Sequence, residues 1–347
     1  MIKLSFQPKQ ITKKLLAVLN DRSRDILTKR YGLDPKNPAI FTLESIGKEY
    51  NITRERVRQI EEYSLSSIRK SDAYKDSESI IEELKGVIDD MGSIVPEDDL
   101  LEELSKSKTI QNQIHFILVV GSPFFKKKDD EFFKHRWYID QNLMEQVEDS
   151  IKNIYANLSK DDIITEAQMV NHFLDKVQNI SEKYKNDAII KRWLKLSKKI
   201  NSNPLGEWGR SDSSNINVKG IRDYAYLVIR DHGSPIHFKE VAESIAKIFN
   251  KKAHVATCHN ELIKDPRFVL VGRGLYALTE WGYASGVVKD VIKNILIQNG
   301  PLSKEEIVNK VLKERYVKEN TILVNLQNGC DFVKNEDNTY SLVCPVL

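Results

Sequence analysis

The sequence lacks the features that would mark a secreted or membrane protein. It has no N-terminal segment of the kind that forms a signal peptide, and its apolar runs, such as 116–120, are far shorter than the ~20 residues that span a bilayer. Cysteine is scarce, because Cys258, Cys330 and Cys344 are odd in number, widely separated and without zinc spacing. We therefore predict a cytoplasmic protein that has no disulfide framework and does not contact a membrane.

Motifs of catalysis are also missing. The sequence contains no phosphate-binding G-x-x-x-x-G-K-[ST] loop, no G-x-G-x-x-G fingerprint, no H-E-x-x-H zinc motif and no G-x-S-x-G nucleophile elbow. Its seven histidines are dispersed, and the pair that flanks Cys258, His254 and His259, lacks the further ligands that a metal site needs. The sequence predicts a protein that is not an enzyme, with no catalytic residue, no cofactor and no metal.

Charge is unevenly distributed along a chain of otherwise ordinary composition. The 347 residues are 41% hydrophobic and 30% charged, as expected of a globular protein with two or more cores. Residues 1–70 hold fifteen Lys/Arg against eight Asp/Glu, a net +7, whereas residues 71–104 hold two against twelve, a net −10. This change marks a domain boundary near residue 70. Three roles stay open for the acidic stretch: repelling DNA from one face, contacting a basic partner, or solvating a helix.

Residues 42–70 carry the pattern of a helix-turn-helix. The first helix has an apolar stripe at i, i+3, i+4 and i+7, formed by Leu43, Ile46, Gly47 and Tyr50. Asn51 and Ile52 form the turn, and Thr53 is expected to cap the second helix by accepting a hydrogen bond from a free backbone N–H. The inward positions of the second helix are Val57, Ile60, Ser64 and Ile68.

That spacing leaves a polar, cationic strip on the outward face of the second helix. It comprises Arg54, Glu55, Arg58 and Gln59, with Arg56 beside them. Arginine donates two hydrogen bonds to guanine O6 and N7, glutamine pairs with adenine, and glutamate accepts from cytosine N4. We predict that these five residues bind DNA, although a solvated charged face is the alternative interpretation.

The same residues resemble region 4 of the sigma-70 family of bacterial transcription initiation factors. The resemblance rests on TRERVRQIE at 53–61, TLESIGKEY before it and RDILTKRYGL at 24–33, and it covers about residues 15–70. It implies that the second helix binds a promoter −35 element through Arg54, Glu55, Arg58 and Gln59. It also implies docking on the β flap of RNA polymerase. The residues of the corresponding helices are Leu16, Leu19, Ile26 and Leu27, for which internal packing is the alternative.

A complete sigma factor also melts DNA with an aromatic-rich region 2 that lies upstream of region 4. Only about fifteen residues precede the match, too few for a domain. We therefore expect that the chain does not open a promoter alone.

Residues 71–347 contain a repeated sequence motif. An apolar residue, four mostly polar residues and another apolar residue recur from Val95, Ile164, Ile236 and Leu302, at spacings of 69, 72 and 66. Each motif begins a helix, with Ser303 and Glu306 forming a capping box, and each is followed by a helix and a strand-like stretch. The order predicts a mainly α fold, in which a helix-turn-helix domain (1–72) precedes winged-helix modules at 76–140, 141–212, 218–284 and 286–347.

The third module resembles the HARE-HTH domain, a winged helix of chromatin regulators, restriction enzymes and the delta subunit of some bacterial RNA polymerases. The resemblance covers 221–283, and its matching parts are the first helix with Ala225 and Val228, SPIHFKEVAESI at 234–245 and a glycine-framed wing at 267–278. Gly272 and Gly274 are expected to allow positive φ in the wing turn. Arg267 and Arg273 are candidates for phosphate contact, with a merely solvated hairpin as the alternative.

The other modules differ in their basic residues. In the second module, 188–200 is expected to form one helix with Lys191, Lys195, Lys198 and Lys199 on its outward face, binding phosphate as point charges. The first module has an aromatic-rich hairpin at 124–137, whose rings we expect to pack internally. The fourth has no basic third helix, because 320–328 is nearly uncharged, and is expected to meet protein.

Together these features favour a sequence-specific DNA-binding transcription factor in the nucleoid. Its predicted partners are promoter-like double-stranded DNA and the RNA polymerase core. One alternative is a delta-like polymerase accessory subunit that acts mainly through protein contact. Another is an accessory DNA-binding protein of a restriction or modification system.

Overall fold

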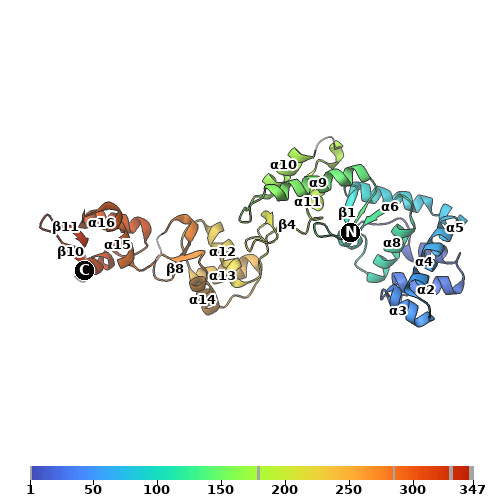
Figure 1. The fold of residues 1–347 in the computed structure, drawn as a ribbon, viewed down its shortest axis with the longest axis horizontal. Coiled ribbons are helices and arrows are strands. Elements are labelled where there is room, and N and C mark those ends of the chain that lie inside the picture. The colour runs from blue at the N-terminus through green and yellow to red at the C-terminus, as the bar shows by residue number, and fades with distance from the viewer. Residues whose placement is uncertain (1, 178–179, 284–285, 328–330, 344–347) are drawn as a thin grey trace. The chain divides into compact units, whose positions relative to one another are not determined.

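The computed structural model describes residues 2–177, 180–283, 286–327 and 331–343. Over these residues the chain is mainly helical, with seventeen α-helices and short antiparallel strands, which confirms the predicted fold class (Figure 1). The chain divides into two compact units, 1–201 with 208–212 and 202–207 with 213–347. No helix in the described ranges is both long enough and apolar enough to cross a membrane.

The head of the first unit is a helix-turn-helix supported by three further helices. Its helices are α1 (Pro8–Leu16), α2 (Asp21–Tyr31), α3 (Leu43–Tyr50), α4 (Arg54–Arg69) and the short α5 (Asp72–Lys75). Thr53 caps α4, since its hydroxyl accepts from the Arg56 N–H over 3.1 Å, as predicted. The buried residues Ile26, Ile46 and Val57 join α2, α3 and α4 in a small core.

Gly47 permits the tight turn between α3 and α4. A Cβ at this position would lie 2.7 Å from the carbonyl oxygen of Ile52 and 3.4 Å from the Arg54 nitrogen, both backbone atoms. Asn51 ends α3 in the left-handed region with φ 54° and ψ 42°, a conformation that Asn tolerates better than most residues. Two local features therefore set the angle at which α4 leaves the turn.

Four modules of one design follow the head. The first contains α6 (Glu78–Asp90), β1 (Ile94–Pro96), α7 (Glu97–Leu104), α8 (Lys108–Val120), β2 (Phe125–Lys127) and β3 (Arg136–Tyr138). The second contains α9 (Gln141–Asn157), α10 (Glu166–Lys176), η1 (Glu182–Tyr184), α11 (Asp187–Leu194), β4 (Ile200–Ser202) and β5 (Trp208–Arg210). In the first module β3 lies between β1 and β2, antiparallel to both.

The second unit contains the remaining two modules. The third consists of α12 (Ile221–His232), β6 (Ile236–His237), α13 (Phe238–Phe249), α14 (Val255–Lys264), β7 (Phe268–Leu270) and β8 (Leu275–Leu278), followed by η2 (Thr279–Trp281). The fourth consists of α15 (Val288–Asn299), β9 (Leu302–Ser303), α16 (Lys304–Glu314), α17 (Glu319–Leu326), β10 (Phe332–Lys334) and β11 (Thr339–Leu342). Both sheets place the second wing strand in the middle, as in the first module.

The repeated motif falls at the same point of each module. Val95, Ile236 and Leu302 lie in β1, β6 and β9, directly before α7, α13 and α16. Ile164 pairs with Trp208 as an isolated bridge just before α10. The expected helix starts are confirmed, as is the capping box in which the Ser303 N–H donates to Glu306 over 2.9 Å.

The head and the first module share one continuous hydrophobic core. It extends from Leu15 to Trp137 and takes in residues of α1, α2, α4, α6 and α8. The third helix of the first module, α8, is buried over most of its length and lies beside the head helices (Figure 1). In a winged helix that binds DNA, the third helix is the element that enters the groove. Here the head occupies the place beside α8 that DNA would take.

Polar contacts fix α8 against the head at both ends. The buried Asn112 side chain donates to the carbonyl oxygens of Gly32 and Pro38 over 2.9 and 3.0 Å. At the other end the Arg69 guanidinium donates to the carbonyls of Val119 and Val120 over 2.8 and 3.0 Å. Because these bonds satisfy backbone acceptors after α2 and at the end of α8, they hold α8 in a defined register against α2 and α4.

Candidate nucleic-acid interface

The five residues predicted to read DNA lie together on α4. Arg54, Glu55, Arg56, Arg58 and Gln59 are all exposed, whereas Val57 between them is fully buried. This separation follows from the 3.6-residue period, which places Val57 on the face that packs against α2 and α3. The structure thus brings the five side chains onto one solvent-facing surface at the first two turns of the helix.

Arg58 is the most constrained member of this surface. Its Nε and Nη2 donate to Glu55, with distances of 2.9 and 2.6 Å to the nearest oxygens, and its Nη1 pairs with Glu62. The hydrogen bond from Arg58 lowers the pKa of the Glu55 carboxyl below its ordinary value. Both carboxylates therefore compete with any base or phosphate that Arg58 contacts.

The neighbouring side chains are arranged differently. Arg56 Nη1 donates to the Gln59 amide oxygen over 3.1 Å, so these two residues form a pair across one helical turn. Arg54 stands at the N-terminus of α4, where the helix dipole adds a partial positive charge. This end of the helix combines a cation with free backbone N–H groups, an arrangement that favours an anion such as phosphate.

The four apolar residues considered for polymerase contact are internal. Leu16 and Leu19 are 8% and 9% exposed, and Ile26 and Leu27 are completely buried. Leu16, Leu19 and Leu27 belong to the core shared with the first module, and Ile26 to the helix-turn-helix core. The packing alternative therefore describes all four residues in this structure.

The lysines of the second module do not form one helical strip. The expected helix over 188–200 is wrong beyond residue 194, because α11 ends at Leu194. The Ser197 hydroxyl accepts from the backbone N–H groups of Lys199 and Ile200 over 3.0 and 3.1 Å, and Lys198 N–H donates to the Phe132 carbonyl over 2.7 Å. These bonds replace the helical ones and turn the chain toward β4.

Three of these lysines lie against carboxylates. Lys191 pairs with Glu166 over 3.0 Å, while Lys198 and Lys199 pair with Asp129 and Glu131 of the first-module hairpin over 2.6 and 2.9 Å. Lys195, the C-cap of α11, is exposed and has no ion pair within the described ranges. The predicted basic surface is thus largely neutralised within the protein.

The first-module hairpin itself has mostly buried aromatic rings. Phe124, Phe133 and Trp137 are at most 7% exposed, while Phe125 is about half exposed. Phe133 and Trp137 belong to two different hydrophobic cores. The expectation that these rings pack internally is confirmed for Phe124, Phe133 and Trp137, whereas Phe125 remains accessible.

The third-module wing differs from its prediction in one glycine. Gly274 has φ +73°, as expected, but Gly272 does not adopt positive φ. A Cβ at Gly272 would lie 2.8 Å from the carbonyl oxygen of Tyr316, and the Tyr316 N–H donates to Val271 over 2.9 Å. Gly272 is therefore required because the chain leading into α17 passes close to the wing.

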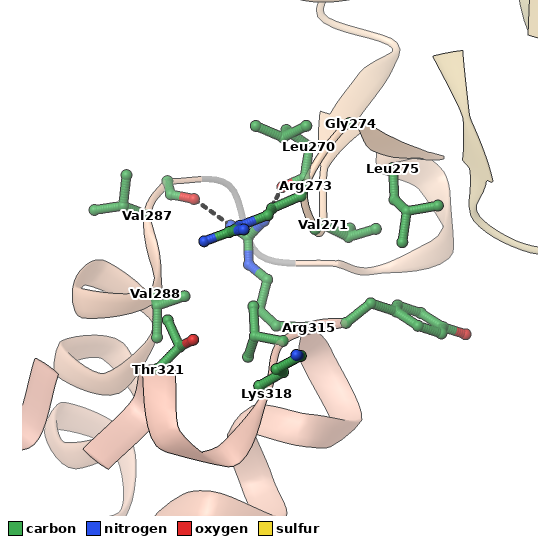
Figure 2. A pocket seen from close by; sticks show the side chains of 14 residues that line it. Leu270, Val271, Arg273, Gly274, Leu275, Val287, Val288, Arg315, Lys318 and Thr321 are labelled. Carbon is green, nitrogen blue, oxygen red and sulfur yellow. Dashed lines mark hydrogen bonds between the residues drawn. The ribbon is translucent and has the colours of Figure 1, made fainter. Parts of the chain in front are cut away.

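The two wing arginines have different surroundings. Arg267 is 23% exposed and pairs with Asp265 and Asp223 over 2.7 and 2.9 Å. Arg273 is exposed and lines a hollow of about 590 Å³ together with Arg315, whose guanidinium donates to the carbonyls of Leu270 and Gly286 (Figure 2). Arg273 is thus the wing cation that remains accessible, while Arg267 stabilises the module.

Cysteine and histidine form no metal centre in the described residues. No group of three or more His, Cys, Asp or Glu side chains is placed to hold an ion there. Cys258 is completely buried, and its burial raises the pKa of the thiol to about 11, so it is unreactive. His259 stacks on Phe238 with ring centroids 4.3 Å apart, and Cys330 and Cys344 lie outside the described residues.

Comparison with known proteins identifies the head. Residues 15–70 match the family model described as Sigma-70, region 4. The chain is 50% identical over 56 residues to the RNA polymerase sigma factor SigA of Nostoc sp., which covers 16% of this chain and 14% of that protein. It is 46% identical over 56 residues to SigA of Clostridium acetobutylicum, again 16% and 14%.

A third relative extends the comparison to another group of bacteria. The RNA polymerase sigma factor RpoD of Neisseria gonorrhoeae is 38% identical over 60 residues, 17% of this chain and 9% of that protein. The chain therefore spans about one seventh or less of the length of these curated relatives. The likeness runs from the last two residues of α1 through α2, α3 and α4, and it includes every residue of the predicted DNA-reading strip.

Proposed function

We propose that this chain, whose residues 15–70 are a sigma-70 region 4 domain, is a sequence-specific DNA-binding transcription protein that recognises a promoter −35-like element. The observation that carries the proposal is the exposed strip on α4, which combines three arginines, a glutamate and a glutamine behind a capped turn. These side chains are the types that distinguish base pairs in the major groove. The protein acts without covalent chemistry and without a cofactor.

The network on α4 gives each residue a role in this proposal. On binding DNA, Arg58 releases Glu62 and contacts the edge of a base. Glu55, which lies one turn toward the N-terminus, stays bonded to Arg58 and keeps the Arg58 side chain extended. Gln59, held by Arg56 over 3.1 Å, presents its amide to the same groove. Arg54 contacts the phosphate backbone, which positions the helix but carries no sequence information.

Association with RNA polymerase is the second part of the proposal. The curated relatives that match the head are named as RNA polymerase sigma factors, which supports a polymerase partner for the head. Because Leu16, Leu19, Ile26 and Leu27 are buried, the polymerase contact uses other surfaces of the chain. DNA melting is not part of the proposal, since the likeness covers no more than about 14% of those proteins.

The modules after the head extend the contact with DNA or polymerase. The third module has the helix, strand, helix, helix and hairpin order of a winged helix, which supports the HARE-HTH and delta-like resemblance. Arg273 at its wing and Lys195 in the second module are accessible cations and supply sequence-independent phosphate contact.

A second candidate function is a polymerase accessory subunit that works mainly by protein contact. Two observations favour it: α8 is buried against the head, and Lys191, Lys198 and Lys199 are paired with carboxylates. Three of the four second-module lysines expected to bind phosphate are therefore occupied by carboxylates. In this alternative the α4 strip is a secondary contact.

Fluorescence anisotropy of the full chain tests the two functions. Arg58→Ala is expected to weaken binding to a −35-type duplex about ten- to a hundredfold and to leave binding to a scrambled duplex nearly unchanged. Lys195→Ala is expected to weaken both duplexes alike, with a smaller salt slope. Lys106→Ala, which removes an exposed lysine elsewhere in the first unit, is the matched control and should change neither.

The salt response separates DNA binding from protein docking. Binding through several phosphates falls steeply between low and moderate salt, whereas apolar docking on core polymerase changes little. Equal loss on both duplexes for Arg58→Ala would exclude base reading. Weak, equal binding of the unmodified chain to both duplexes, together with salt-resistant binding to core polymerase, would establish the accessory subunit instead.

A further inference from the structure

A groove lies between the wing of the third module and the start of the fourth. It is the hollow of about 590 Å³ that Arg273 lines, and all fourteen of its lining residues belong to the second compact unit. We call it the inter-module groove. Figure 2 shows lining residues from both modules: Leu270 and Arg273 from the wing, and Val287, Val288, Lys318 and Thr321 from the fourth module. Its volume falls in the range of sites that bind ligands.

Contacts within the protein fix the shape of the inter-module groove. Arg315 is 4% exposed, and its guanidinium donates to the carbonyl oxygens of Leu270 in β7 and Gly286 before α15. Beside it, the Tyr316 N–H donates to the Val271 carbonyl over 2.9 Å. The protein itself therefore ties the two walls together, and a ligand does not lose free energy in ordering them.

The margins of the inter-module groove are apolar and exposed. Leu270 is 46% exposed and Val287 is 64% exposed, and the half-buried Val288 and Val317 lie between modules in the same lining. These side chains come from separate segments of the chain and gather around one hollow, so they differ from single apolar residues scattered over a surface. Gathered apolar residues with a polar rim mark places where another molecule binds.

The charged residues that line the inter-module groove are all cations. They are Arg273, Arg315 and Lys318, and none of the fourteen lining residues is acidic. Arg273 and Lys318 are exposed and form no ion pair within the described ranges. The acids nearest in sequence, Asp290 and Glu319, do not line the groove, and the Asp290 carboxylate accepts from the Val287 N–H over 2.9 Å. The groove therefore attracts a negatively charged ligand.

We propose that the inter-module groove docks a segment of a partner protein in which acidic residues flank a large apolar side chain. The apolar side chain packs against Leu270 and Val287, and the carboxylates pair with Arg273 and Lys318. DNA matches this surface less well, because its phosphates would pair with the cations but would set a charged backbone against the two aliphatic side chains. The docking site goes beyond DNA reading by α4 and does not depend on it.

Selection of random dodecapeptides displayed on phage, with the full chain immobilised, tests the chemistry of the occupant. The recovered peptides should carry a net negative charge and at least one large aliphatic or aromatic side chain. The most enriched peptide, synthesised with a fluorescent label, should bind the full chain at one site with a Kd below about 100 µM.

Two paired variants locate the peptide in the inter-module groove. Arg273→Glu/Lys318→Glu sets like charges against the acidic residues and should weaken peptide binding at least about tenfold. Leu270→Thr/Val287→Ser removes the apolar contact and should weaken binding by a similar factor. The second pair keeps a β-branched residue in β7 and supplies a good N-cap to α15, so the Tm should not fall.

Control variants change similar residues outside the inter-module groove. Lys247→Glu/Lys304→Glu reverses two exposed lysines, and Ile263→Ser removes an aliphatic side chain that is 62% exposed. Both should leave the Kd of the peptide within about twofold of the unmodified value. Arg58→Ala should also bind the peptide unchanged, so that failure of peptide docking is distinguished from failure of DNA reading.

Three results would overturn the proposal. The first is no enrichment of peptides, or enrichment of peptides that are not acidic. The second is peptide binding that persists in both groove variants. The third is a different occupant: duplex binding that Leu270→Thr/Val287→Ser weakens would assign the groove to DNA. Likewise, a dimer in sedimentation velocity that Arg273→Glu/Lys318→Glu abolishes would assign the groove to a second copy of this chain.

Discussion

The ion pair between Arg136 and Glu148 joins the first and second modules. The Arg136 side chain is completely buried and that of Glu148 is 6% exposed. Arg136 Nε donates to Glu148 Oε1 over 2.6 Å, and Nη1 donates to the Lys134 carbonyl over 2.8 Å. Asp130 and Lys127 extend the network with distances of 3.2 and 2.8 Å. Both charges of the central pair have been taken out of water, so removing one leaves the other uncompensated.

Three variants distinguish the stability lost when one partner of the pair is removed from the net contribution of the pair to stability. Glu148→Gln leaves a buried guanidinium with only the half-exposed Asp130 as a counter-charge, and should destabilise the first unit by about 3–5 kcal/mol. Arg136→Met should cost a similar amount. The double variant Arg136→Met/Glu148→Leu removes both charges and their desolvation penalties, so its stability should lie within about 1 kcal/mol of the unmodified chain. The effects of the two substitutions on stability are thus strongly non-additive.

Hydrogen exchange in the first unit is the appropriate measurement, because a chain of several modules need not unfold in two states. Asp72→Asn, which breaks an exposed pair with Lys75, is the matched control and should leave protection unchanged. Single variants that each cost less than about 1 kcal/mol, or a double variant that loses the sum of both, would refute the reasoning.

Three further predictions concern the head and its support. Burial lowers the pKa of His115 to about 4, below its unfolded value, so its contribution to stability is complete above pH 6.5 and falls by about 2 kcal/mol on going to pH 5. His115→Gln should abolish this loss in denaturation curves at the two pH values. Gly47→Ala should destabilise the helix-turn-helix by about 1–3 kcal/mol, because the new Cβ meets backbone at Ile52, and should weaken DNA binding on every duplex in the anisotropy assay. Asn112→Asp should lower the stability of the head by about 2–4 kcal/mol, since it removes two donors to buried carbonyls and places a carboxylate beside them. The loss is measured as reduced protection from hydrogen exchange around Gly32, and unchanged protection would exclude a role for this contact.

Local patterns in the sequence are sufficient to predict the helix-turn-helix and the repeat. The apolar stripe of the first helix, which includes Ile46, and that of the second, which includes Val57, each depend on residues three or four apart, and the Thr53 cap depends on its own helix. The same holds for Ser303 and Glu306, which are three residues apart. Patterns of this kind can be recognised from the sequence alone, because both partners lie within one helical turn.

The failures concern contacts between distant residues. The end of α11 at Leu194 depends on pairing of 196–198 with 132–134, some sixty residues away. The acids that neutralise Lys198 and Lys199 lie on the same distant hairpin. Residues 114–120 are apolar at every position except His115, which is typical of a buried helix, and yet this pattern does not identify the head as the partner. The periodicity of a helix or a strand does not show which distant segments of the chain pack together.

The burial of α8 determines where this protein can be divided. A fragment that ends near residue 72 would retain every helix of the sigma-70 region 4 domain but would uncover the apolar side chains that α8 covers, among them Leu15, Tyr31 and Ile68. Such a surface favours aggregation and loose packing. A fragment that keeps this core whole must extend at least to Trp137. The smallest fragment that keeps the sigma-70 region 4 domain together with its whole core is therefore about twice the length of that domain.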